Sequence, residues 1–222
     1  SRAEEFYNGS ARAGFQGWVK VGFGKNGRIK AIDAFVVQDN GPTGGFWDFQ
    51  NFGDASSIVF QPEAMRYRGI PVLTNTPPKG PQRGPGENQT ANIMEPIMNK
   101  AARKLGIDPL DLRLVNSPGE GGKNATVGAK QSPVTSAYLK EALEQGAKTF
   151  GYAEKKKNSG KRNGSKIRAV GIGQAYHSAG AAGFDGLVRI TPDGVLHIHT
   201  GVGNLGTYSY MDTARVAAEV LG

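Results

Sequence analysis

Cysteine is absent from all 222 residues of the sequence. This absence excludes disulfide bonds, thiolate metal ligands and cysteine nucleophiles. An iron–sulfur cluster would therefore have to be held by another chain. Long apolar runs and a secretory signal are also lacking, so the sequence predicts no membrane association and a cytoplasmic location.

Acidic residues are in the minority, because 27 Lys and Arg face 19 Asp and Glu, which gives a net charge of +8. A basic balance favours a polyanionic ligand, either nucleic acid or a phosphate-bearing cofactor. Five basic residues gather in Lys155-Lys156-Lys157 and Lys161-Arg162, among Asn, Ser and Gly. No aromatic residues alternate with them, so we expect no nucleic-acid binding and interpret residues 155–166 as a solvated linker.

The first third of the chain reads mainly as strands and loops. Residues 18–23 and 28–38 are predicted strands, and Asn26-Gly27 between them is a strong hairpin signal. Residues 41–54 are expected to form an irregular loop, and residues 70–74 a short strand. Four prolines then exclude regular structure as far as Gly86.

Three helices are predicted before the basic linker. The first covers residues 90–105 and closes at Gly106, and Pro96 should kink it or delay its start. The second begins at Asp108-Pro109, where Asp caps the helix and Pro occupies its first turn. The third covers residues 136–150.

After the basic linker the pattern changes. Residues 167–176, 186–190 and 195–200 read as strands, and residues 209–221 as a final helix. We therefore predict an α+β chain of two mixed α/β subdomains, at residues 1–154 and 167–222, joined by the linker at 155–166.

Two glycine-rich loops are candidate ligand sites. In residues 82–86 the glycines allow close backbone approach, and Arg83 offers a guanidinium to an oxyanion or phosphate. The alternative is a proline-stiffened connection with a solvated Arg. Residues 201–207 resemble a phosphate cradle in outline, but they lack the Gly-Lys-Ser/Thr of a Walker motif.

Aromatic and histidine side chains give further candidates. Tyr176 ends a predicted strand and is suited either to stacking on a flat substrate or to packing in the core. His197 and His199 alternate on a strand, but no third ligand is near in sequence, so we interpret them as surface residues.

Taken together, the motifs resemble a known family. Thr74-Asn75-Thr76-Pro77, Arg83-Gly84-Pro85-Gly86, residues 106–113 and residues 193–221 occur in the order seen in the molybdopterin domain of xanthine dehydrogenases, aldehyde oxidoreductases and aerobic CO dehydrogenases. The resemblance covers nearly the whole chain but only the middle of a family subunit. We therefore expect a fragment, or one chain of a split subunit.

The resemblance implies molybdenum on a molybdopterin, which in bacterial members is a dinucleotide form such as the cytosine dinucleotide. It implies hydroxylation of an aromatic heterocycle or aldehyde, with oxygen from water and electrons leaving through Fe–S clusters to FAD on other chains or domains. The implied partners are the remaining parts of the large subunit, an Fe–S subunit, a FAD subunit and a small-molecule substrate. The family's general-base Glu and its upstream Gly-Phe-Gly-Gly loop have no counterpart here.

The family's active-site residues carry over in part. Arg83 matches the arginine beside the molybdenum centre, and its loop places Gly84 and Gly86 at the cofactor. Pro85 and Tyr176 fall where purine-oxidising members hold the substrate between two aromatics. Asn51 falls near their substrate-orienting Arg.

In the family's Gly-Gln-Gly loop, which here corresponds to Gly206, Thr207 and Tyr208, Thr207 replaces the Gln that bonds the cofactor. These departures argue against xanthine as substrate. They leave open a reductive dehydroxylase of the same family, or a structural or assembly subunit without turnover of its own.

Overall fold

The computed structural model describes residues 1–4, 9–44, 46–178, 186–201 and 209–222. Two compact units divide the chain, Ser1–His177 and Ser178–Gly222. The boundary thus falls after the expected basic linker at 155–166, most of which folds into a helix and a small hairpin of the first unit.

The first unit is built on a three-stranded sheet in the order β1-β2-β3. Strands β1 (Phe15–Phe23) and β2 (Ile29–Asp39) form the predicted antiparallel hairpin, with Trp18 opposite Phe35. Strand β3 (Ala64–Val72) lies parallel to β2 and is longer than the strand expected at 70–74. A parallel neighbour requires a crossover connection, and a helix supplies it.

That crossover helix, α2 (Asp48–Phe60), corrects the expectation of an irregular loop at 41–54. The glycine and aromatic residues of this segment suggested a loop. In the structure, Phe52, Ile58 and Val59 are buried on one face of the helix. Gly53 is required there, because a Cβ atom would lie 2.7 Å from the ring of Tyr67.

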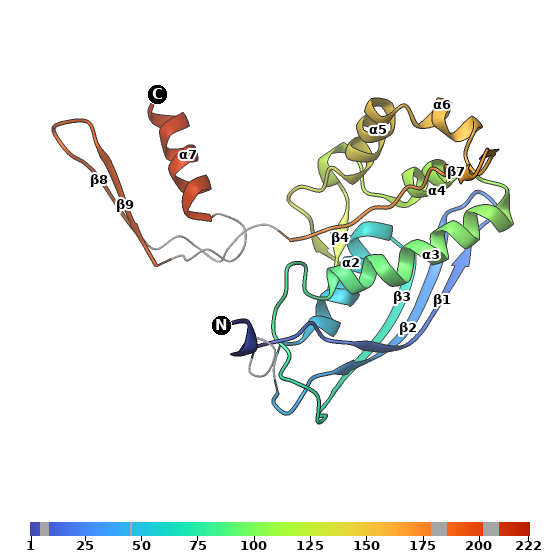
Figure 1. Cartoon of the computed structure of the whole chain (residues 1–222), viewed down its shortest axis with the longest axis horizontal. Helices are drawn as coiled ribbons and strands as arrows, with labels where there is room; N and C mark the ends of the chain where they lie inside the picture. Colours follow the sequence, from blue (N-terminus) through green and yellow to red (C-terminus); the bar gives the residue numbers. More distant parts are fainter. Residues whose placement is uncertain (5–8, 45, 179–185, 202–208) are drawn as a thin grey trace. The chain divides into compact units, whose positions relative to one another are not determined.

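Helix α3 (Glu87–Leu105) is the longest in the described structure, and α2 and α3 lie along one face of the sheet (Figure 1). It runs through Pro96, which therefore does not delay its start, and ends at Gly106 as predicted. Its buried Met94, Met98 and Ala102 join residues of β2 and α2 in the core. Burial of this apolar face is the main source of the first unit's stability.

The rest of the first unit consists of short elements. Helix α4 (Pro109–Asn116) begins as predicted, because Asp108 accepts a hydrogen bond of 2.7 Å from the Leu110 N–H. The remaining elements, in chain order, are η1 (Glu120–Gly122), β4 (Thr126–Val127), β5 (Ser132–Pro133), α5 (Leu139–Phe150), α6 (Tyr152–Lys157), β6 (Arg162–Asn163) and β7 (Lys166–Ile167).

Residues 168–177 contain no strand, which corrects the expected strand at 167–176. The segment is held by side chains instead of a sheet ladder. Ser117 donates a hydrogen bond of 2.7 Å from Oγ to Oε1 of Gln174, and Tyr176 packs against the hydrophobic core. Sequence periodicity cannot distinguish such an extended segment from a strand.

The second unit contains an antiparallel pair, β8 (Gly186–Ile190) and β9 (Leu196–Thr200), and helix α7 (Ser209–Leu221). All three elements match their predicted positions to within one residue. The overall α+β prediction is confirmed. No helix in the described parts of the chain is long and apolar enough to cross a membrane.

Candidate functional site

The loop at residues 82–86 lies at the start of α3 and is held on two sides. Arg12 donates hydrogen bonds of 2.7 and 3.2 Å to the carbonyl oxygens of Arg83 and Gly84. Asn51, on α2, donates from Nδ2 to the carbonyl oxygen of Pro85 over 2.9 Å. Three residues that the sequence nominated separately, Asn51, Arg83 and Pro85, are thus brought to one place.

Gly86 joins the loop to α3 and has no substitute. Its φ is +77°, and a Cβ atom would lie 2.1 Å from the carbonyl oxygen of Asp48. Its N–H donates a hydrogen bond of 3.0 Å to Oε1 of Gln89. The Gln89 amide in turn donates a hydrogen bond of 3.2 Å to the buried carboxylate of Asp48. Burial raises the pKa of Asp48, and the Gln89 amide opposes that rise.

Arg83 itself is exposed, and within the described residues its guanidinium has no hydrogen-bond or ion-pair partner. Gly84 leaves space beside it, since an added Cβ atom would meet nothing closer than 3.8 Å. An exposed guanidinium with open space beside it suits a phosphate or another oxyanion. The residues present therefore fit a phosphate-bearing cofactor such as molybdopterin.

Residues 174–176 lie against the N-terminal part of α3. Gln174, Ala175 and Tyr176 line a small pocket with Glu87 and Thr90 of α3 and with residues of α2. Burial raises the pKa of the Tyr176 hydroxyl, and the nearby carboxylates of Glu87 and Asp54 add to that rise. Tyr176 is half-buried and packs against the edge of the hydrophobic core.

Glu87 and His177 are among the residues here that the sequence analysis did not nominate. Glu87 opens α3 with a side chain that is only 6% exposed, and its Oε2 lies 2.8 Å from Nδ1 of His177. The position of Glu87 directly after the glycine loop was the one available signal. Its pairing with a residue 90 positions away was not readable from spacing.

The predicted second loop lies outside the described residues for the most part, including Gly206, Thr207 and Tyr208. His197 and His199 are exposed on β9, as expected of surface residues, with parallel rings 6.4 Å apart. Across the described ranges, no group of three or more His, Cys, Asp or Glu is placed to hold a metal ion.

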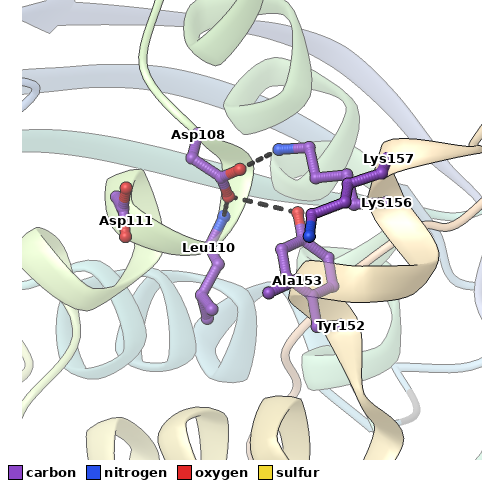
Figure 2. A pocket seen from close by; sticks show the side chains of 7 residues that line it. All are labelled: Asp108, Leu110, Asp111, Tyr152, Ala153, Lys156 and Lys157. Atoms are coloured by element: carbon purple, nitrogen blue, oxygen red, sulfur yellow. Dashed lines mark hydrogen bonds and ion pairs between the residues drawn. The ribbon is translucent and has the colours of Figure 1, made fainter.

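A separate pocket lies between α4 and α6 (Figure 2). Its carboxylate, Asp108, caps α4 and also receives Tyr152 Oη at 3.1 Å and the ammonium group of Lys156. These contacts tie part of the basic segment to α4. We therefore interpret this pocket as part of the packing contact between α4 and α6.

The approach to the Arg83 loop is fixed by Asp39 at the end of β2. Its carboxylate accepts hydrogen bonds from Thr74 and from Thr76, the latter at 2.8 Å, and pairs with Lys79 at 3.3 Å. The Thr74 hydroxyl is the main cause that lowers the pKa of Asp39 to about 2, and Thr76 and the Gly41 N–H add to it. The Thr-Asn-Thr-Pro motif thus anchors the proline-rich segment.

This contact predicts a pH-dependent stability. Because the folded pKa of Asp39 is about 2 and the unfolded value is about 3.9, its stabilisation is complete above pH ~4. It is lost as the pH falls through about 2. We expect Asp39→Asn to cost about 1 kcal/mol at pH 7, after allowance for solvent screening of a side chain that is 30% exposed. Urea unfolding of both proteins between pH 7 and pH 2 should show this difference shrinking at low pH, and a constant difference would contradict the assignment.

Comparisons with known proteins place this site in context. The profile of the molybdopterin cofactor-binding domain matches residues 1–117. The putative xanthine dehydrogenase molybdenum-binding subunit XdhA of Escherichia coli K12 is 26% identical over 100% of this chain and 30% of its own length. The aldehyde oxidoreductase molybdenum-binding subunit PaoC of Escherichia coli O157:H7 is 26% identical over 92% of this chain and 27% of its own length.

Solved structures share the fold. The aldehyde oxidoreductase from Desulfovibrio desulfuricans matches with a TM-score of 0.72 and 23% identity, over 85% of this chain and 21% of that one. This chain thus spans about a third or less of the length of the relatives it matches. The profile match covers more than half of the chain, and the chain belongs to the molybdopterin cofactor-binding domain family.

Proposed function

We propose that this chain is the cofactor-binding part of a molybdenum hydroxylase that oxidises an aromatic heterocycle or an aldehyde. The observation that carries the proposal is the exposed guanidinium of Arg83, which has no hydrogen-bond or ion-pair partner among the described residues. Its loop is held by Arg12 and Asn51 at the start of α3. When bound, the molybdenum cofactor supplies the redox chemistry that adds oxygen from water to the substrate.

The chain's own residues position the cofactor and the substrate and polarise them. Arg83 provides a positive charge for an oxyanion of the cofactor, and the glycine at 84 leaves room for that approach. Asn51, on α2, donates a hydrogen bond to the Pro85 carbonyl oxygen and so positions the loop. We propose that Asn51 also lies near the substrate. Tyr176 offers the edge of an aromatic ring to a planar substrate.

We also propose that the cofactor is the cytosine dinucleotide form. Fe–S clusters and FAD would be bound by other chains or domains. Absence of cysteine from this chain is consistent with clusters carried elsewhere. The relatives named as molybdenum-binding subunits support an assembly of several polypeptides. Those partners would include the rest of the large subunit.

Arg83→Ala tests the proposal. Because the substitution removes a charge-assisted hydrogen bond of about 1.5–3 kcal/mol, we expect cofactor occupancy or turnover of the assembled complex to fall at least tenfold. The exposed side chain makes no hydrogen bond or ion pair with other described residues, so unfolding should be unchanged. Arg103→Ala, which removes a cation from the last turn of α3, is the matched control. Molybdenum content and activity equal to those of the wild type would refute the role of Arg83.

A further inference from the structure

Strand β3 forms one edge of the three-stranded sheet, with β2 as its only strand neighbour in the described part of the chain (Figure 1). The Asn40 N–H donates to the Val72 carbonyl oxygen over 2.9 Å. Every second residue counted back from Val72 therefore bonds to β2. The residues between them, Met65, Tyr67 and Gly69, direct their N–H and C=O groups to the free edge, where the described residues offer no hydrogen-bond partner.

A groove of about 1180 Å³ runs along this edge between β3, α2 and the β4–β5 hairpin. On the helix-covered side of the sheet its lining includes Phe49, Met65 and Tyr67, and the latter two also pack against the core. Because neighbouring strands lie about 4.8 Å apart, the groove has room for an extended chain beside β3. Every second side chain of such a strand would face this apolar lining.

The opposite face of β3 carries positive charge. The Arg66 side chain is 68% exposed and pairs with Asp33 over 2.5 Å. Arg68 lies over the rings of Trp18 and Phe35 and has no ion-pair partner among the described residues. Two guanidinium groups thus share one carboxylate. Side chains directly opposite each other on neighbouring strands are about 5 Å apart, and opposite charges there are stabilising.

We infer that the free edge of β3 is a docking site for an extended segment of another polypeptide, which adds to the sheet as a fourth strand. Backbone hydrogen bonds to Met65, Tyr67 and Gly69 hold it. The segment alternates apolar residues, which face the groove, with acidic residues, which face Arg66 and Arg68.

Other occupants fit this edge less well. A second copy of β3, paired so that the Met65 and Tyr67 faces match, would bring Arg66 and Arg68 opposite each other, and like charges in that position are destabilising. Strands β8 and β9 carry a basic residue and two histidines but no acidic residue. Neither supplies the carboxylates that the cationic face requires.

We assign the docking segment to the rest of the large subunit. An unpaired edge along a nine-residue strand invites aggregation unless it is permanently covered. The match to Escherichia coli XdhA takes up 30% of that subunit, so most of such a polypeptide lies outside the matched part. The source of the segment therefore rests on the proposed function, whereas the strand pairing does not.

Hydrogen exchange in the assembled complex, resolved to single residues, tests the pairing. The outward N–H groups of Met65, Tyr67 and Gly69 should exchange as slowly as the inward ones of Arg66 and Arg68, to within about tenfold. Outward groups that exchange about 100-fold faster than the inward ones would overturn the inference.

Two charge reversals on the same face test the acidic character of the segment. Arg68 borders the free edge, whereas Lys20 lies on β1, two strands away, although both cations lie over the Trp18 ring. Arg68→Glu should speed exchange of the outward N–H groups about 3- to 10-fold, because an attraction becomes a repulsion. Lys20→Glu should leave those rates unchanged. Equal effects of the two variants would contradict an acidic segment at the edge.

Cross-linking identifies the source of the segment. The chain has no cysteine, so Ile70→Cys places a single thiol on it, next to Arg68 on the exposed face of β3. A thiol-attached photo-cross-linker should capture a segment of the large subunit in which acidic and apolar residues alternate. Capture of a second copy of this chain, or of another subunit, would overturn the assignment.

The outcomes separate this inference from the proposed function. A molybdenum-loaded complex whose outward N–H groups exchange freely would overturn the strand pairing alone. An assembled complex with a protected β3 edge but without molybdenum would overturn the proposed function and support the strand pairing.

Discussion

Gly86→Ala is expected to lower the free energy of unfolding by about 3 kcal/mol or more. Two costs add. An L-residue at φ +77° is strained by about 1–2 kcal/mol, and the new methyl group would lie 2.1 Å from the backbone carbonyl oxygen of Asp48. Backbone on both sides must move to relieve that contact, at a cost of about 1–3 kcal/mol.

Gly106→Ala is the matched control for this prediction. Gly106 has a similar φ of +67°, but nothing lies within 4 Å of an added Cβ atom. It should therefore show the backbone cost alone, about 1–2 kcal/mol. Chemical denaturation of both variants measures the difference. Equal losses at the two positions would contradict the close approach of the Arg83 loop to α2.

Arg113→Met is expected to cost about 3–5 kcal/mol of stability. The Arg113 side chain is fully buried, and it donates to Glu95 Oε2 over 2.5 and 3.0 Å and to Asn99 over 3.0 Å. Burial already raises the pKa of Glu95 against the opposing effect of Arg113. Removal of the cation would leave a buried carboxyl group without its charge partner.

The double variant Arg113→Met, Glu95→Met separates the pair's own contribution from the cost of breaking it. Replacement of both charges by apolar side chains of similar volume is often neutral or stabilising. We therefore expect the double variant to recover most of the loss seen in the single variant. An equal loss in both proteins would show that packing of the Arg113 side chain, rather than its charge, is the larger effect.

Much of the fold was predictable because its signals are local. Asn26-Gly27 specified the β1–β2 hairpin, and Asp108-Pro109 specified the start of α4, since turn and cap chemistry operate within a few residues. Gly106 ended α3 for the same reason. Helix α7 matched its predicted bounds because its apolar residues repeat at helical spacing.

Elements held by distant contacts were predicted poorly. Helix α2 was missed because its glycine and aromatic residues suggested a loop, and only the ring of Tyr67 beside Gly53 explains why a glycine is tolerated there. We predicted a strand at 167–176, but residues 168–177 have no strand partner, and Tyr176 packs against the hydrophobic core instead. Neither arrangement is encoded within a short window.

The candidate site likewise combines residues that the sequence predicted with contacts that it did not. Arg83 and the glycines beside it were recognisable as a motif, and Asn51 and Tyr176 were nominated through family resemblance. The long-range contacts that assemble the site, from Arg12 to the Arg83 carbonyl and from His177 to Glu87, connect residues 71 and 90 positions apart. Spacing alone carries no information about such pairs.

Molybdenum analysis of the native complex tests whether this chain holds the molybdenum cofactor. The complex would be purified with this chain in its natural proportion to the other subunits. Mass spectrometry would then give the number of molybdenum atoms per copy of the chain. We expect close to one molybdenum per copy in the wild type and a marked loss in Arg83→Ala, with full occupancy in Arg103→Ala. A correctly assembled wild-type complex that contains no molybdenum would contradict this expectation.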